Sequence, residues 1–426
     1  LPVQEITSEG VRHPGRAWVQ KEFFLSTFVA VGDSGHYAKA VTTLKEAGFN
    51  YVETAWQPAH VTEAILRECD RQGLSVMAQD LSVVGGWHCG LEQGSFQPFH
   101  PDSVETFLQR YGAHPSLKSV YICDEPHPGD YGTVREYTDE FERRRPDLLG
   151  FSVLLPSYYE PFGWTETARI RYDEYVDRYI AEVNPAVLSM DYYPFQSPAD
   201  TTPERFYQSL FWKDMGLFRD RALRHELPHW FYYQTVKVND ANPVILPAYV
   251  TVQAWAAVMY GVKGLSTYTA LGSAVDRKGE RASLFDIQQK VNSELRALGN
   301  TLLHLKSTAV YHAEDTPVPD AYAARPAASP WLAGLPAHVS AGEFADRENN
   351  AYILFLNRDF TADREYVIPL KDTFRIYACD KHDGGKQSVL HEAADQLSLC
   401  LEAGEGVLLR IEPADSKPKL ITYRIL

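Results

Sequence analysis

The feature of this sequence that most constrains its fold is an alternation of short β-rich runs with longer amphipathic stretches between residues 22 and 306. In the first amphipathic stretch Tyr37, Val41 and Leu44 share one helical face, and Gly48 supplies a stop. Eight runs have the composition and length of buried strands: Phe23–Val31, Asn50–Ala55, Leu74–Asp80, Ser119–Glu125, Gly150–Leu155, Ala186–Tyr192, Trp230–Val236 and Gly264–Thr269.

The amphipathic stretches between these runs predict the helices of an α/β fold. A second helix has Val61, Ile65 and Cys69 on one face and ends at Gly73, and later ones are expected at about 102–113, 132–145, 173–183, 203–224, 247–261 and 284–305. Eight strand–helix units match a (β/α)8 TIM barrel, which takes ~250 residues plus insertions. A doubly wound sheet would carry a Gly-rich phosphate turn after its first strand, which the sequence lacks, and neither a P-loop nor an HExxH motif occurs.

The composition changes after the predicted barrel. Residues 313–337 are rich in Pro and Ala, which indicates a connector. Beyond it, short β-rich runs separated by turns such as Asp383-Gly384-Gly385 predict a small C-terminal antiparallel β-sandwich. The expected domains are therefore a barrel over 1–312, a connector over 313–337 and a sandwich over 338–426.

The charge balance of the chain limits the classes of partner that it is expected to bind. The chain has 41 Lys+Arg against 56 Asp+Glu, a formal charge of −15, and its one short basic run reads as the end of a helix. Nucleic acid is therefore not an expected partner, because binding it requires the neutralisation of phosphates. No apolar stretch is long enough to span a bilayer. The chain begins with Leu1 and not with Met, which is consistent with a removed leader or tag, and no signal peptide is visible. A secreted or periplasmic location is the working expectation, and a cytoplasmic one stays open. The oligomeric state is left open.

Acidic residues end several of the predicted strands, at the edge where barrel enzymes place their active sites. Glu125, after the fourth strand, is the predicted general acid, since aromatic walls would favour its protonated form. A Glu that caps the next helix or pairs with Arg is the alternative. The second carboxylate is either Asp124 or Asp191. Adjacent residues on a strand diverge, so Asp124 needs a bulge or bend to face the same pocket as Glu125.

Other polar and aromatic residues near the strand ends are candidates for holding a sugar. Each of these residues also has a structural interpretation. The aromatic residues could pack in the core, which is favoured for Tyr233. Glu53 and Asp80 could form ion pairs at the rim, and Gln234 could hydrogen-bond to the backbone. Neither a catalytic metal nor a cofactor is expected, because the first strand lacks the HxH of barrel metallohydrolases. The candidate substrate-binding residues are Glu53, Trp56, Asp80, Trp87, His88, Trp164, Tyr192, Tyr193, Gln234 and Tyr268.

At Asp124-Glu125-Pro126 the chain resembles clan-A glycoside hydrolases, whose acid/base Glu ends strand four in an Asn-Glu-Pro motif. Two further segments, 190–195 (Met-Asp-Tyr-Tyr-Pro-Phe) and 260–268, are similar to motifs in barrels related to family-42 β-galactosidases. Clan A also places a nucleophilic Glu at the end of strand seven, where this sequence has Gln234. Asp124 stands where clan A has Asn.

An Asp-Glu dyad on strand four resembles the family-123 β-N-acetylgalactosaminidases, in which the substrate's own 2-acetamido group attacks. This resemblance implies that Asp124 polarises the acetamido group and that Glu125 is the acid/base. The function expected from the sequence is hydrolysis of O-glycosidic bonds in oligo- or polysaccharides. A carbohydrate-binding barrel without hydrolysis and a lyase or isomerase with a Tyr base are the alternatives.

Overall fold

The computed structural model describes residues 5–7, 10–29, 31–32, 35–85, 98–162 and 170–414. The chain forms two compact units. The first comprises Leu1–Tyr193, Arg221–Val236 and Gly264–Asn292, and the second comprises Pro194–Asp220, Lys237–Lys263 and Ser293–Leu426.

The first unit holds eight parallel strands in two four-stranded sheets. Each of the eight predicted runs overlaps one of them, so the α/β architecture is confirmed. The orders are β3-β10-β9-β8 and β4-β5-β6-β7. The bounds are β3 (Phe24–Phe28), β4 (Tyr51–Glu53), β5 (Ser75–Ala78), β6 (Leu117–Asp124), β7 (Leu149–Val153), β8 (Leu188–Tyr192), β9 (His229–Gln234) and β10 (Gly264–Tyr268).

Backbone hydrogen bonds just outside these strands join the two sheets at both edges. The Asn50 amide donates to the Leu25 carbonyl at 3.1 Å, between β3 and β4. The Leu154 amide donates to the Ser189 carbonyl at 2.9 Å, between β7 and β8. The carboxyl ends of neighbouring parallel strands therefore lie at one edge, and this edge holds the predicted acids.

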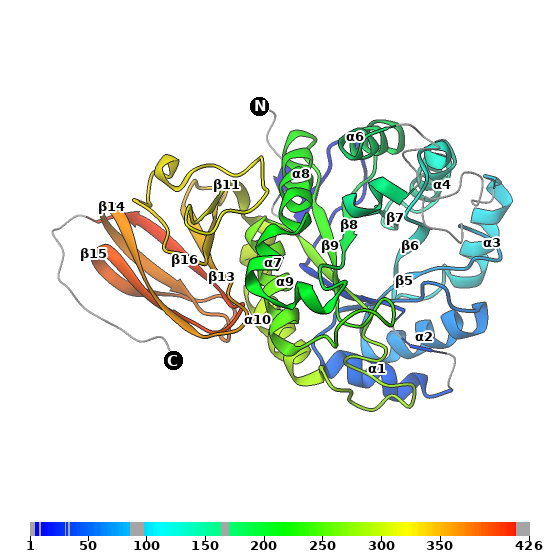
Figure 1. Ribbon diagram of the computed structural model, residues 1–426. Coiled ribbons are helices and arrows are strands. Elements are labelled where there is room, and N and C mark those ends of the chain that lie inside the picture. The colour runs from blue at the N-terminus through cyan, green and yellow to red at the C-terminus, as the bar shows by residue number, and fades with distance from the viewer. Residues whose placement is uncertain are drawn as a thin grey trace. The chain divides into compact units, whose positions relative to one another are not determined.

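Helices flank the parallel strands of the first unit (Figure 1). The second helix ends at Gly73, as predicted, with a left-handed φ of 75°. A short hairpin of β1 (Glu5–Thr7) and β2 (Gly10–Arg12) precedes β3. The helices are α1 (Tyr37–Glu46), α2 (Ala59–Gln72), α3 (Pro101–Tyr111), α4 (Tyr131–Arg144) and α6 (Tyr172–Val183), with 3-10 turns η1 (Pro128–Asp130) and η2 (Ser157–Phe162).

The expected single helix over 203–224 is wrong, because the structure has two helices there. These are α7 (Pro203–Gln208) and α8 (Phe211–Arg224), and η3 (Pro198–Thr201) precedes them. The Phe206 carbonyl accepts the Trp212 indole N–H at 2.8 Å and the Ser209 hydroxyl at 2.7 Å. The same carbonyl also accepts the Ser209 amide at 3.1 Å, so these donors together satisfy the last turn of α7, and the helix can end within the apolar pattern.

The second unit contains one six-stranded antiparallel sheet, in the order β11-β12-β13-β16-β14-β15. An antiparallel sheet was predicted here, but it begins with residues 306–312, which were expected to belong to the barrel. β14 pairs with β16 only over residues 374–378, and its first half pairs with β15 and, through one bridge at Leu370, with Leu332. The strands are β11 (Lys306–His312), β12 (Val339–Ala345), β13 (Ala351–Asn357), β14 (Arg364–Cys379), β15 (Gln387–Leu401) and β16 (Gly406–Pro413).

One apolar core joins both halves of the long strand β14. Ile368 in its first half and Ile376 in its second half share a cluster with Ile353 and Leu399. The predicted β-sandwich is thus a single hydrogen-bonded sheet, and both halves of β14 contribute to its core. The 3-10 turn η4 (Pro326–Ala328) lies in the expected connector, which is partly buried.

Helix α9 (Pro247–Met259) packs against β12, β13 and β16 of the same unit. Every residue of α9 from Tyr249 to Met259 is buried, as expected for a helix that is apolar on all sides. A Cβ at Gly342 would lie 2.2 Å from the Met259 carbonyl oxygen, and one at Gly406 would lie 2.6 Å from the Trp255 ring. Glycine thus permits the close approach of α9 to the sheet. Helix α10 (Phe285–His304) contains residues of both units.

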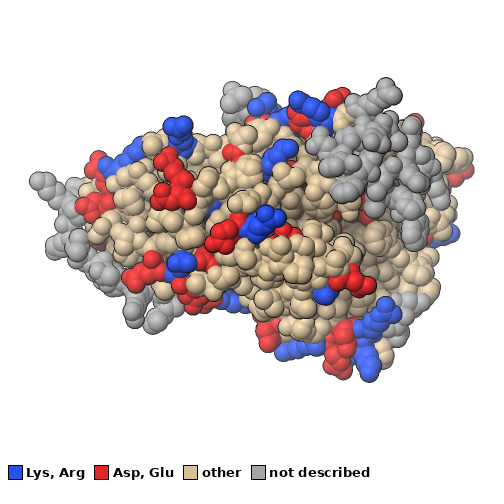
Figure 2. Space-filling model, viewed as in Figure 1, with Lys and Arg blue, Asp and Glu red and all other residues tan. Residues whose placement is uncertain are grey.

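Within the described residues, no helix is both long and apolar enough to cross a membrane. On the face shown in Figure 2, acidic and basic side chains are interspersed, and the coloured residues form no continuous basic patch.

Candidate active site

Asp124 and Glu125 lie at the carboxyl end of β6, where the backbone departs from a regular strand. The pairing of β6 with β7 shifts register between Tyr121 and Cys123, as at a β-bulge. Glu125 follows with a φ of 49°, a left-handed conformation that is rare for a residue other than glycine. The sequence required a bulge or a bend for the two acids to serve one site, and the structure has both. Such backbone strain concentrates at functional sites.

Glu125 is hydrogen-bonded through its side chain to Asp191 of β8. Burial raises the pKa of Asp191, the nearby charge of Asp124 adds to this, and hydrogen bonds from Tyr193 and Glu125 oppose it. A hydrogen bond between two carboxyl groups requires that one of them carries a proton. Two carboxyl groups in contact cannot both be ionised at low cost, so the pair retains one proton. The site therefore contains a carboxylic acid ready to donate.

Asp124 is buried beside this pair and is held by a phenol. The Tyr121 hydroxyl donates a hydrogen bond to Asp124 Oδ1 at 2.7 Å. Burial raises the pKa of Asp124, and the bond from Tyr121 partly offsets the shift by favouring the carboxylate. The bond also fixes the orientation of the side chain.

Glu53, at the end of β4, lies deeper than expected of a sugar-binding residue. Its exposed fraction is 0%. Its oxygens accept hydrogen bonds from the Tyr232 hydroxyl at 2.9 Å and the Ser266 hydroxyl at 2.7 Å. Burial raises the pKa of Glu53 to about 7, and the charge of Asp124 contributes to the shift. These contacts favour a supporting role beneath Asp124 over direct contact with a sugar.

Asp80 has the ion-pair environment that was the alternative to sugar binding. One of its oxygens accepts from Arg110 Nη1 at 2.7 Å and from the Tyr111 hydroxyl at 2.8 Å. The other accepts from the Ser82 hydroxyl at 2.6 Å. Burial alone would raise the pKa of Asp80, but these hydrogen bonds hold it below its ordinary value. Both oxygens are thus engaged by protein donors.

Tyrosines surround the Glu125–Asp191 pair. Burial raises the pKa of the Tyr158 phenol, and the nearby charges of both acids raise it further. The ring of Tyr158 meets that of Tyr192 edge-on at 5.0 Å. Tyr193 also lies near both acids, and its ring is 4.9 Å from that of Tyr268. These rings form apolar walls with hydroxyl groups, as a sugar-binding site requires.

Trp56, three residues after the end of β4, is a predicted sugar-binding residue whose side chain is exposed to solvent. Its exposed fraction is 38%, and its ring packs edge-on against Phe28 at 5.0 Å. Its φ of 58° turns the chain at this point. Gln234 is fully buried. Tyr233 points elsewhere and accepts a hydrogen bond from Gln288 at 2.8 Å, so the core role favoured from sequence is confirmed.

Three of the predicted site residues, Trp87, His88 and Trp164, lie outside the described residues. His127 is buried, and its Nδ1 accepts the Gly129 amide at 2.9 Å, which caps the turn η1. In the part of the chain that the structure describes, no group of three or more His, Cys, Asp or Glu residues has an arrangement that could hold a metal ion.

Sequence reasoning did not single out Tyr121, Tyr232 and Ser266, which hold the buried acids. Strand alternation carries a signal for two of them. Tyr232 and Ser266 lie two residues before Gln234 and Tyr268, so each shares a strand face with a predicted site residue. Tyr121 precedes a bulge, so regular alternation does not place it.

Neither a protein-family model nor a curated protein matches this sequence. Solved structures do match its fold. A GH27 β-L-arabinopyranosidase from Geobacillus stearothermophilus aligns with a TM-score of 0.50 at 10% identity, over 93% of this chain and 97% of that chain. A GH51 arabinofuranosidase from Xanthomonas axonopodis pv. citri aligns at 0.44 and 10% identity, over 95% and 98% of the two chains. A family 5 mannosidase from Rhizomucor miehei aligns at 0.45 and 11% identity, over 68% and 96%. The first likeness shows that the chain shares the fold of that enzyme.

Proposed function

We propose that this protein is a glycoside hydrolase in which Glu125 protonates the leaving oxygen and Asp124 supplies the second carboxylate. The observation that carries the proposal is the convergence of Asp124, Glu125 and Asp191 at the carboxyl ends of β6 and β8, with Glu125 hydrogen-bonded to Asp191. The shared fold with a GH27 β-L-arabinopyranosidase supports it. The proposal includes closure of the eight strands into a (β/α)8 barrel.

In the first step Glu125 transfers its proton to the glycosidic oxygen as the bond to the anomeric carbon breaks. The adjacent Asp191 favours retention of that proton until substrate arrives, since a negative charge disfavours ionisation of its neighbour. After the leaving group departs, the Glu125 carboxylate acts as the base: it takes a proton from the water that attacks the anomeric carbon, and this restores the protonated acid.

The second role falls to Asp124 because the other positions do not provide a free carboxylate. The strand β9 ends in Gln234, where clan-A enzymes have a nucleophilic Glu. Asp191 is hydrogen-bonded to Glu125, whereas an inverting pair is typically separated by ~6.5–9.5 Å to admit water. A substrate with a 2-acetamido group would supply its own nucleophile: the acetamido oxygen attacks the anomeric carbon, and Asp124 stabilises the cationic ring that forms. Water then opens this ring.

The test is cleavage of paired 4-nitrophenyl hexosides that differ only at C2, such as the galactoside and the N-acetylgalactosaminide. We expect cleavage of the 2-acetamido member only. Its rate should fall by at least ~10²-fold in Asp124→Asn. Asp102→Asn is the control, because Asp102 is highly exposed on α3. Equal cleavage of both members would contradict the assisted mechanism. If an oligosaccharide bound but was not cleaved, the protein would be a carbohydrate-binding barrel and not a hydrolase.

A further inference from the structure

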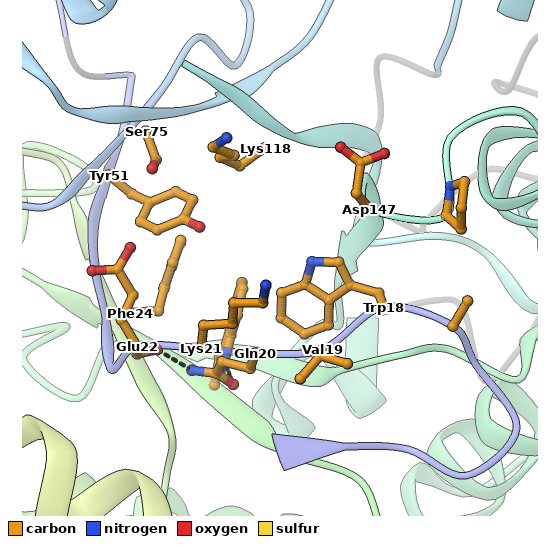
Figure 3. A pocket seen from close by; sticks show the side chains of 13 residues that line it. Trp18, Val19, Gln20, Lys21, Glu22, Phe24, Tyr51, Ser75, Lys118 and Asp147 are labelled. Atoms are coloured by element: carbon orange, nitrogen blue, oxygen red, sulfur yellow. Dashed lines mark hydrogen bonds between the residues drawn. The ribbon is translucent and has the colours of Figure 1, made fainter. Parts of the chain in front are cut away.

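A cavity of about 550 Å³ lies at the amino ends of the parallel strands, the opposite end from the acids (Figure 3). Lys118 at the start of β6 lines this cavity, whereas Asp124 ends the same strand, ~20 Å away at ~3.3 Å per residue. All of its lining residues belong to the first unit: Ala17, Trp18, Val19, Gln20, Lys21, Glu22, Phe24, Tyr51, Ser75, Lys118, Pro146, Asp147 and Trp230.

Aromatic rings build one wall of the cavity. Trp230 stacks on Phe24, with ring centroids 3.9 Å apart and an interplanar angle of 8°. Trp18 meets Trp230 edge-on at 6.0 Å, and Tyr51 packs against Phe24 at 4.8 Å. Gln20 fixes this wall from the side, because its Oε1 accepts the Trp230 indole N–H at 3.0 Å. The rings therefore support one another before any ligand arrives.

The carboxylates that line the cavity already have donors. Asp147 accepts two hydrogen bonds from the Arg145 guanidinium, each of 2.9 Å. The Arg145 guanidinium lowers the pKa of Asp147, so it remains ionised and paired. Glu22 accepts from Asn50 Nδ2 at 2.8 Å.

The two lysines that line the cavity differ from these carboxylates in their pairing. Among the described residues, no carboxylate forms an ion pair with Lys21 or Lys118, although Lys118 is near enough to Asp147 to influence it electrostatically. In the view of Figure 3, the Lys21 ammonium lies between Tyr51 and Trp18, and the Lys118 ammonium lies above these rings, between Ser75 and Asp147. The cavity thus offers two unneutralised cations beside a preformed aromatic wall, in a chain of net charge −15.

We propose that this cavity binds a small ring compound that carries one carboxylate. The ring would lie against Trp18 and Tyr51, and the carboxylate would accept charge-assisted hydrogen bonds from Lys21 and Lys118. The volume falls within the ~300–1,000 Å³ typical of small-molecule sites. The ring is either a sugar, as in a uronic acid, or an aromatic ring. This second site is independent of the proposed hydrolysis at the opposite strand ends.

Isothermal titration calorimetry of the full chain tests the proposal with two acids and their uncharged counterparts. The pairs are D-glucuronate with D-glucose and 4-hydroxybenzoate with 4-hydroxybenzyl alcohol. At least one acid is expected to bind, more tightly than its counterpart. The double variant Lys21→Gln/Lys118→Gln should weaken binding by at least tenfold, which corresponds to ~1.4 kcal/mol. Higher salt should also weaken it.

Lys278→Gln is the matched control, since Lys278 is exposed and does not line the cavity. This variant should bind as the parent does. Preference for glucuronate would identify a sugar acid as the ligand class, and preference for 4-hydroxybenzoate would identify an aromatic acid. The proposal would be overturned if neither acid bound, if the uncharged counterparts bound equally well, or if the double lysine variant retained full affinity. These readouts do not depend on hydrolytic activity.

Discussion

Glu125 is hydrogen-bonded through its side chain to Asp191, although the two acids come from strands separated by β7 in the sequence. The contact requires the left-handed turn at Glu125, because a regular strand would direct the side chains of Asp124 and Glu125 to opposite faces. In the proposed mechanism, the negative charge of Asp191 holds a proton on Glu125, and Asp124 is the second carboxylate. One local departure from strand geometry thus assembles the acid and its neighbours.

Tyr121→Phe is expected to shift the acid limb of the kcat–pH profile upward by about 0.5–1 pH unit. The hydrogen bond from Tyr121 favours the ionised form of Asp124 and lowers its pKa, so removal of the hydroxyl raises that pKa. A higher pH is then needed to ionise the same fraction of Asp124. Tyr233→Phe is the control, because it removes an equally buried hydroxyl that bonds to Gln288. Coincident profiles for Tyr121→Phe and the parent would argue against a catalytic carboxylate at Asp124.

Glu53→Gln is expected to change how stability depends on pH. The folded-state pKa of Glu53 is raised to about 7, above its ordinary value near ~4.3, so the folded chain holds this proton where the unfolded chain releases it. The parent should therefore lose stability as pH rises from about 4.5 to 7, by on the order of 2–3 kcal/mol, and the variant should not.

Urea denaturation at pH 5 and pH 8 measures this difference between Glu53→Gln and the parent. Relative to the parent, the variant should gain stability at pH 8 over pH 5. Glu136→Gln is the control, since Glu136 is exposed on α4 and should show no such change. An equal pH dependence in the parent and Glu53→Gln would show that Glu53 is already ionised within the fold.

Gly342→Ala is expected to destabilise the second unit by about 1–3 kcal/mol, because the new Cβ would overlap the Met259 carbonyl of α9. Gly334→Ala is the matched control, since its Cβ would meet no atom closer than 3.9 Å. Thermal denaturation of both variants tests the difference. Similar transition temperatures for the two variants would mean that α9 can move away from the sheet without cost.

The sequence was sufficient to predict the eight parallel strands, because apolar β-rich runs and glycine stops are local signals. It also placed Asp124, Glu125 and Asp191 at strand ends. The partners of the buried acids were not predictable in the same way. Glu53 is bonded to Tyr232 and Ser266, which are 179 and 213 residues away in the sequence. Such pairs depend on strand order and register, which local patterns do not specify.

Two other features escaped prediction for physical reasons of their own. The pattern of β11 is short and follows directly after a long helix, so it reads as the end of the barrel although it pairs with β12. The cavity at the amino ends of the strands is built by residues from distant segments, including Trp18, Tyr51 and Lys118. In the sequence its lysines cannot be distinguished from other surface lysines, because the aromatic wall beside them comes from other segments.

The measurement that tests the central claim most directly is the leaving-group dependence of hydrolysis by Glu125→Gln. The variant cannot donate a proton, so cleavage of a 4-nitrophenyl or alkyl glycoside should fall by at least ~10²–10⁴-fold in kcat/KM. A 2,4-dinitrophenyl glycoside has a leaving group that needs little protonation, so its first step should be largely retained. Unchanged hydrolysis of all these substrates by Glu125→Gln would contradict the role assigned to Glu125.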